Sequence, residues 1–391
     1  MHTYVVLRDL SNASVAGPFE TGLATVEEVV TEPRVDVERL DKADVQDVAR
    51  DPQVRSIAEV MPTRLVEPVA SSEAAAAAAA AWGIGAVGAD TSARTGADVV
   101  VAVLDTGIDA DHPAFAGVTL TQIDFTGSGL GDRNGHGTHC AGTIFGRDVD
   151  GTRIGVARGV DRALIGKVLA DDGRGNSAWM FDGLQWAVNQ GAHVVSISIE
   201  LDFPNFVRRV VDEEGWPVDL ATSRALEAYR ATLHMFEALM AMIRSREAFG
   251  AGTMVVAAAG NGSRRNVDPD HEIGVALPAA ADGVVSVAAV GQSPQGLQVA
   301  AFSNTFAQIS APGVGIVSAA TGGGLRTLDG TSMACPHVAG LVALWREEVL
   351  ASPLPANTAT VTAKLLASAG TDGFAAGIDV ADRGVGLAVA P

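Results

Sequence analysis

The stretch Gly330-Thr331-Ser332-Met333-Ala334-Cys335-Pro336-His337 is followed directly by the apolar run Val338–Leu344. The small residues around Ser332 and the run after them predict a tight turn that leads into a buried helix. The N-terminus of a helix has a partial positive charge and unpaired amides, which stabilise developing negative charge. A hydroxyl is a weak nucleophile by itself, so a reactive Ser332 would need a base and an orienting carboxylate elsewhere in the chain.

Two further motifs contain these groups. His136 lies in NGHGTHCAG (residues 134–142), and Asp105 begins DTGID after an apolar run. His136 is expected to take the proton of Ser332, and Asp105 to fix the imidazole tautomer and stabilise its charge. Taken alone, each residue could have an ordinary structural role. Asp105 could cap the end of a strand, His136 could be a loop histidine, and Ser332 could be a helix N-cap. The chain order Asp, His, Ser, with all three motifs present, disfavours those alternatives.

From about Trp82 to its end, the chain resembles the subtilisin-like serine proteases in these motifs. Residues 256–262 (VAAAGNG) are similar to the oxyanion-hole segment of that family. The resemblance implies that Asn261 and the backbone N–H of Ser332 would form the hole, although Asn261 could instead be a turn residue between two glycines. It also implies a serine endopeptidase that cleaves peptide bonds through an acyl-enzyme, with a peptide or protein as substrate.

Strand-like apolar runs alternate with helical segments throughout this region. The pattern predicts an α/β fold in which helices cover both faces of a mostly parallel sheet. The site should then lie at the carboxyl ends of the strands, where Asp105 and Asn261 follow apolar runs. The expected strands are residues 99–104, 163–169, 194–199, 253–259 and 284–290, and the expected helices are residues 178–189, 220–249 and one beginning at His136.

Three regions are predicted along the chain. Residues 1–68 predict a small α+β domain with a helix over residues 42–50, and residues 45–57 resemble the end of the family's inhibitory propeptide. The resemblance implies a self-processing zymogen whose N-terminal domain is its intramolecular inhibitor; an unrelated accessory domain is the alternative. Residues 69–81, rich in alanine, predict a linker and a processing site. Residues 82–391 form the predicted catalytic domain.

The resemblance implies that substrate adds as a strand between two edges, Gly173-Arg174-Gly175 and Ser198-Ile199-Glu200. The sequence departs from the family at two places: Ser177 replaces an aromatic residue of the distal pocket, and Glu200 replaces a glycine. We hypothesise that Glu200 pairs with a basic substrate residue close to the cleaved bond. The alternative is a solvated carboxylate at the end of a strand.

The segment between the second edge and Asn261 is longer than in typical relatives by roughly two dozen residues. Apolar residues recur in it at helical spacing and predict one apolar helix face. A helix that packs on the sheet is expected; a coiled-coil partner surface is the alternative, although the stripe covers fewer than three heptads. The residues of this stripe are Leu226, Tyr229, Leu233, Phe236, Met240 and Ile243.

No metal ligands are predicted. His139 and Cys140 follow the predicted base at a spacing that matches no zinc motif. Calcium is left open: many relatives hold a structural ion with an aspartate nine residues after the catalytic one, and Ala114 stands there. Asp148 and Asp150 could bind an ion elsewhere, with a solvated turn as the alternative.

Cys140 should lie one helical turn after His136 and on the same face, if a helix begins there. A bulky reagent on its thiol would displace the imidazole. This position predicts inactivation by mercurials, a trait that the resemblance to thiol-containing members of the family also implies. The alternative is a buried thiol that only fills the core.

Composition excludes several other classes of protein. The formal charge is −19, from 27 basic and 46 acidic residues, which disfavours nucleic-acid partners. No apolar run has membrane-spanning length. The sequence as written begins without a secretory signal, which predicts a cytoplasmic protein, or a secreted one if a leader had been removed. Two cysteines do not make a secreted disulfide framework.

Two rival functions remain to be weighed. One is a catalytically silent binding module whose cleft stays blocked by the N-terminal domain, but no member of the expected triad is lost. The other is an esterase, which is disfavoured because residues 330–334 do not form a Gly-x-Ser-x-Gly elbow.

Overall fold

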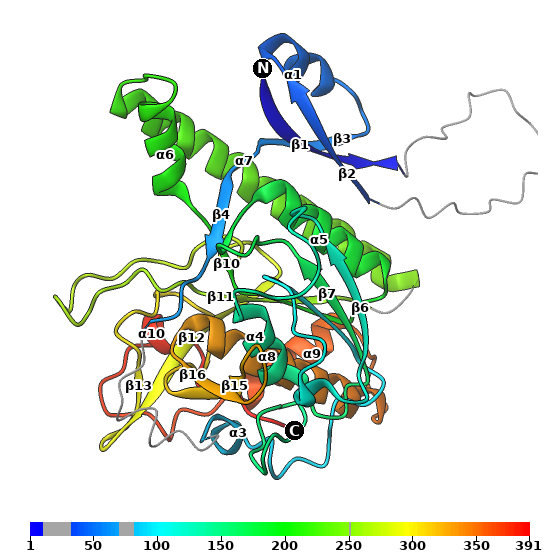
Figure 1. The fold of residues 1–391 in the computed structure, drawn as a ribbon, viewed down its shortest axis with the longest axis vertical. Helices are drawn as coiled ribbons and strands as arrows, with labels where there is room; N and C mark the ends of the chain where they lie inside the picture. The colour runs from blue at the N-terminus through cyan, green and yellow to red at the C-terminus, as the bar shows by residue number, and fades with distance from the viewer. Residues whose placement is uncertain (11–32, 70–81, 250–251) are drawn as a thin grey trace, which may run out of the picture.

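A computed structural model describes residues 1–10, 33–69, 82–249 and 252–391 of the protein. Apart from Val69, the predicted linker over residues 69–81 lies outside the described residues. The N-terminal sheet and the strand β4 (Pro62–Leu65) precede this gap, and the main body of the molecule follows it (Figure 1).

The main sheet is built largely from parallel strands, and β5 (Val100–Asp105) lies in its middle. In the described part of the chain the strand order is β13-β12-β11-β9-β5-β7-β6, with β14 beside β12. Every neighbouring pair is parallel except β12 with β13. The predicted α/β fold with a mostly parallel sheet is therefore confirmed. The other strands are β6 (Thr119–Asp124), β7 (Arg162–Lys167), β9 (Val194–Ile197), β11 (Met254–Ala258), β12 (Val284–Ser293), β13 (Gly296–Val299) and β14 (Ile309–Pro312).

Helices cover both faces of this sheet. Side chains of β5 alternate between the faces, so that Val101 and Val103 join one buried cluster while Ala102 and Leu104 join the other. The first cluster includes α4 (His136–Phe145) and α8 (Thr331–Leu350), and the second includes α5 (Ser177–Asn189) and α7 (Val218–Ser245). The remaining elements of this body are α3 (Trp82–Ala86), η2 (Pro113–Phe115), β8 (Arg174–Asn176), β10 (Ile199–Leu201), α6 (Phe203–Asp212), η3 (Arg246–Phe249), β15 (Ile316–Ala319), β16 (Leu325–Leu328), α9 (Thr358–Ser368) and α10 (Val380–Arg383).

A small sheet near the N-terminus lies against α5 and α7 (Figure 1). Its strands are β1 (His2–Asp9), β2 (Pro33–Leu40) and β3 (Val54–Glu59), in the order β2-β1-β3, and all pairs are antiparallel. The helix α1 (Lys42–Val48) begins at a capping box made by Asp41 and Asp44, which satisfies backbone amides at its first turn. Val5 and Leu7 of β1 share one buried cluster with α5 and α7, so this sheet contributes to the core of the whole chain.

An ion cluster reinforces the contact between α7 and the N-terminal sheet. The guanidinium of Arg224 lies 2.5 Å from Glu59 Oε1 and 2.6 Å from Glu214 Oε2. Arg224 and Glu59 are largely shielded from solvent, which strengthens their attraction relative to an exposed pair. The long α7 therefore contacts the N-terminal sheet as well as the main sheet.

The predicted apolar stripe of α7 is confirmed except at Leu226: Tyr229 and Leu233 are partly buried against the core. Phe236, Met240 and Ile243 are buried, whereas Leu226 is 51% exposed. In the first half of the helix the buried face consists of Ala221, Ala225 and Ala228. Small side chains let neighbouring elements approach closely. A search for large apolar residues at helical spacing overlooks a buried face made of alanines. Among the described helices, none combines the length and apolarity that crossing a lipid bilayer requires.

Replacing Phe236 by alanine should lower the free energy of unfolding by about 3–5 kcal/mol, because the ring is fully buried. Its centroid lies 4.6 Å from that of Phe181. The exposed Leu226 provides the matched control, and Leu226→Ala should change stability by less than about 0.5 kcal/mol. Urea denaturation of both variants measures the difference. Equal losses would contradict the assignment of the buried face.

Candidate active site

Asp105 and His136 form a hydrogen-bonded pair at the carboxyl end of β5. Nδ1 of His136 lies 2.8 Å from Asp105 Oδ1 and 3.0 Å from Oδ2, and both side chains are buried. The backbone N–H of Thr106 also donates to Asp105 Oδ1, at 2.7 Å. An ionised carboxylate can only accept, so Nδ1 of His136 carries the proton and Nε2 is free to take one.

Ser332 lies in the first turn of α8 and is buried against the chain's own N-terminal segment. Its hydroxyl donates to the carbonyl oxygen of Val66 at 2.9 Å. Because a hydroxyl has one proton, Ser332 cannot donate to His136 at the same time. The two residues nevertheless share a neighbour: Cys140 Sγ lies 3.7 Å from His136 Nδ1 and donates to the backbone carbonyl of Ser332 at 3.4 Å.

Asn261 follows β11 and is held from one side by Thr331. Its Oδ1 accepts from the Thr331 backbone N–H at 2.9 Å and from the Thr331 hydroxyl at 2.8 Å. These bonds leave the amide nitrogen pointing into the cleft, where it donates to the carbonyl oxygen of Glu67 at 2.9 Å. Gly260 has φ +108°, and a Cβ there would lie 2.4 Å from Asn304, so the turn requires glycine.

Asp132 organises the loop before His136, although no motif in the sequence indicated it. Its Oδ1 accepts from the Thr106 hydroxyl at 2.9 Å and from the Gly135 N–H at 2.7 Å. Its Oδ2 accepts from the hydroxyl of Thr138 at 2.7 Å. Asp132 therefore links the end of β5 to the first turn of α4. Its only sequence signal was its position just before NGHGTHCAG, in a chain with many acidic residues.

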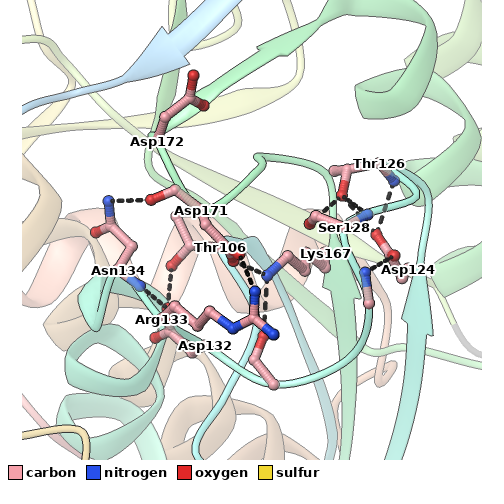
Figure 2. A network of polar contacts seen from close by, with 12 residues as sticks. Thr106, Asp124, Thr126, Ser128, Asp132, Arg133, Asn134, Lys167, Asp171 and Asp172 are labelled. Atoms are coloured by element: carbon pink, nitrogen blue, oxygen red, sulfur yellow. Dashed lines mark hydrogen bonds and ion pairs between the residues drawn. The ribbon is translucent and has the colours of Figure 1, made fainter.

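A buried lysine extends this network towards the first predicted substrate edge (Figure 2). Lys167, 2% exposed, donates to the Gly131 carbonyl at 3.0 Å and to Asp171 Oδ1 at 2.5 Å. Hydrogen bonding to Lys167 is the main cause that lowers the pKa of Asp171. Asp171 also faces Arg133 at 3.3 Å, and its carbonyl accepts from Asn134. The loop that leads into β8 is thereby anchored beside the predicted base.

Strand β4 fills the space between the two predicted substrate edges. It pairs antiparallel with β8 on one side. On the other side it pairs antiparallel with β10 (Figure 1). The Leu65 N–H donates to the Gly173 carbonyl at 2.8 Å, and the Val66 N–H donates to the Ser198 carbonyl at 3.3 Å. Beyond Ser332 the chain continues to Val69, whose N–H donates to the Asp329 carbonyl at 2.8 Å. Residues 62–69 therefore run through the whole candidate site.

The two positions where the sequence departs from the family contact Met61, just before this segment, and Arg64 within it. Ser177 is fully buried, and its hydroxyl accepts from the Met61 N–H at 3.0 Å. Glu200 pairs with Arg64, with 2.6 Å between Arg64 Nη2 and Glu200 Oε1. The Glu200 side chain is only 12% exposed, so the alternative of a solvated strand end is wrong in this state of the chain.

The candidate metal ligands are distributed as follows. Among the described residues, Asp105, His136 and Cys140 bring ligand-type atoms within 4.8 Å of one another, and two of them form the pair described above. Burial lowers the pKa of His139 to about 3, so this imidazole stays neutral. Ala114 is buried, whereas Asp148 is exposed and faces Arg158 at 3.7 Å. Calcium binding by Asp148 and Asp150 stays a hypothesis.

Comparison with known proteins gives a consistent result. A family model described as "Subtilase family" matches residues 96–386. The chain is 31% identical over 308 residues to the "Thermostable alkaline protease" of Halalkalibacterium halodurans, covering 78% of this chain and 70% of that protein. It is 33% identical to the "Intracellular serine protease" of Paenibacillus polymyxa over 66% of this chain and 69% of that protein. It is 33% identical to "Subtilisin BL" of Lederbergia lenta over 68% of this chain and 84% of that protein.

Mercurials that modify Cys140 should slow the reaction of Ser332 with a fluorophosphonate by at least about tenfold, because the thiol touches the His136 ring. Cys140→Ser should remove this sensitivity. Cys335→Ser is the matched control and should keep it, since the Cys335 thiol faces the backbone carbonyls of Ile197 and Val256. Intact mass of the two single-cysteine variants counts the adducts and so establishes which thiol has reacted. Full modification of Cys140 with an unchanged labelling rate would contradict the prediction.

Proposed function

Since the chain belongs to the subtilase family, we propose that it is a serine endopeptidase with Ser332 as nucleophile, His136 as base and Asp105 as the orienting carboxylate. One observation carries this proposal: an extended peptide segment lies between two strand edges with its carbonyl oxygen 2.9 Å from the Ser332 hydroxyl. A substrate bound in the same way would present its main chain to the nucleophile. The serine protease names of the relatives agree with this reaction class.

In the proposed reaction, Ser332 Oγ attacks the carbonyl carbon of the substrate while His136 Nε2 accepts its proton. Asp105 holds the imidazolium through Nδ1. Asn261 Nδ2 and the backbone N–H of Ser332, at the N-terminus of α8, stabilise the oxyanion. The tetrahedral intermediate collapses, the C–N bond breaks, and the leaving amine takes the proton from His136. Water then attacks the acyl carbon while His136 takes its proton. The bond between that carbon and Ser332 Oγ breaks, the carboxylic acid product leaves, and His136 returns the proton to Ser332 Oγ.

The second part of the proposal is that residues 62–69 inhibit the enzyme in its unprocessed form. For attack, the carbon and the oxygen of the same carbonyl group must meet different partners. The carbon must face Ser332 Oγ, and the oxygen must lie in the oxyanion hole. Here the two functions are divided between successive residues: the Ser332 hydroxyl bonds to the Val66 oxygen, and Asn261 bonds to the Glu67 oxygen. This register favours a bound but uncleaved segment. It supports a zymogen that is processed within residues 69–81.

The residue after Glu67 supports the same interpretation. If the segment moved so that Glu67 became the attacked residue, the leaving group would be Pro68. A peptide bond to proline has a ring carbon in place of the amide hydrogen, which fixes the backbone and crowds the nitrogen that must be protonated. Both neighbouring carbonyls are therefore poor sites of cleavage, so the intact segment can stay in the cleft.

Ser332→Ala should abolish peptide hydrolysis and leave the chain intact across residues 69–81, if maturation is self-catalysed. Intact mass of purified wild type and variant, before and after incubation with a fluorophosphonate, measures both results. Wild type should gain one adduct on Ser332, and the variant none. Processing of the isolated variant would refute self-cleavage. A wild-type protein that is never labelled would instead indicate a silent binding module.

Asn261→Ala should lower kcat by about 10²- to 10³-fold with little change in KM, because the lost donor acts on the oxyanion. The variant Asn261→Asp is the matched control for structure, since it keeps the oxygen that accepts from Thr331. An oxyanion role predicts that this variant is impaired at least as strongly. Activity retained by Asn261→Asp but lost by Asn261→Ala would assign Asn261 to holding Thr331 in place.

A further inference from the structure

Glu200 and Arg64 lie opposite each other where β4 crosses β10. The register pairs Arg64 directly with Glu200, and the guanidinium places Nε and Nη2 at 2.7 and 2.6 Å from Glu200 Oε1. Asp202 adds a second carboxylate 3.8 Å from Arg64 Nη1. Two carboxylates from the edge of the cleft therefore face one cation from the bound segment.

Arg64 is much more exposed to solvent than the two carboxylates that it faces. The Arg64 side chain is 45% exposed, whereas those of Glu200 and Asp202 are 12% and 16% exposed. Burial raises the pKa of Glu200, and Arg64 opposes this effect. The other oxygen of Glu200 lies beside Gly260, next to Asn261. When the segment leaves, Glu200 loses the cation that offsets its charge, and a basic substrate residue bound in the same place would restore the pair.

The position of Arg64 relative to the reacting bond is fixed by the same strand. Val66 donates to Ser198, and its carbonyl faces the Ser332 hydroxyl. In the bound segment Asn261 holds the next carbonyl, that of Glu67, so we count from Val66 on the premise that a substrate residue paired with Ser198 turns its own carbonyl oxygen towards Asn261. Arg64 is then the third residue on the N-terminal side, counting Val66 as the first. A substrate that adds as a strand in this register would place its third side chain against Glu200.

We propose that Glu200, assisted by Asp202, selects substrates with arginine or lysine at the third position before the cleaved bond. This inference rests on the proposed endopeptidase function and adds its substrate class: extended peptide segments with a basic residue at that position. Arginine should be preferred over lysine, because its planar guanidinium can give two hydrogen bonds to one carboxylate edge. An acidic residue there should be disfavoured by both carboxylates.

Peptide nitroanilides of the sequence Thr-X-Leu-Val, which copy residues 63–66, provide the test with X as Arg, Lys, Gln or Glu. The full chain is first allowed to mature, and active sites are counted with a fluorophosphonate. Wild type should hydrolyse the Arg peptide with kcat/KM about tenfold above that of the Gln peptide, an effect suited to a half-shielded charged pair. The Glu peptide should be the poorest.

The variant Glu200→Gln should reduce the Arg-to-Gln ratio to about one, and Glu200→Lys should reverse the order of the Arg and Glu peptides. The ratio within one preparation does not depend on how much of each variant folds. Glu213→Gln removes an exposed carboxylate at the end of α6 and should keep the wild-type ratio. A flat wild-type profile, or a basic preference that persists in Glu200→Gln, would overturn the inference and leave the proposed function standing.

A second measurement needs no peptide turnover. In the unprocessed chain, Arg64→Ala should speed fluorophosphonate labelling of Ser332 severalfold, because the blocking segment loses its charged anchor. Arg55→Ala, which removes an arginine of the N-terminal sheet paired with Asp9, is the matched control and should have a smaller effect. Equal effects of the two variants would contradict the anchoring role of Glu200. A wild-type chain that neither reacts with the reagent nor cleaves any peptide would refute the proposed function itself, and with it this inference.

Discussion

A buried carboxylate at the end of the central strand is the constraint around which the site is built. Asp105 is 1% exposed, and a charge in such a position is tolerated only if hydrogen bonds replace its water. His136 and the Thr106 N–H provide them. Thr106 in turn is tied to Asp132, and Asp132 to the first turn of α4. The requirement to satisfy one charge thus fixes the position and tautomer of the imidazole.

The cleft beside this pair imposes a second constraint, because it lies between two strand edges. Unpaired edges present backbone donors and acceptors that bind any extended chain. In the structure β4 satisfies both edges, and the same main-chain bonds that would hold a substrate hold the N-terminal segment. Main-chain pairing does not depend on the peptide's sequence. Selection between peptide sequences must therefore come from side chains, which alternate along the strand. Arg64 against Glu200 is such a contact.

The N-terminal segment is held in the cleft by more than its own strand. Val5 and Leu7 share buried surface with α5 and α7, and Arg224 bridges α7 to Glu59 of β3. Removing the segment from the cleft would also expose this apolar surface, unless the small sheet stayed docked. The position of β4 in the cleft and the packing of α7 against the N-terminal sheet are therefore energetically linked, which supports the proposed inhibitory role of the N-terminal segment.

The sequence alone determined the features that depend on local patterns of residues, namely individual strands, helices and motifs. Apolar runs predicted β5, β7, β9, β11 and β12 of the main sheet and the helices α5 and α7. The motifs around Asp105, His136 and Ser332 predicted the place of these residues at a strand end and at helix starts. Only the tertiary structure showed that residues 62–69 lie in the cleft, that Glu200 meets Arg64, that Lys167 and Asp132 support the site, and that Leu226 faces solvent. The spacing of apolar residues indicates which face of a helix or strand is apolar. The contacts named above join residues that are far apart in the chain, so they depend on how whole helices and strands pack together.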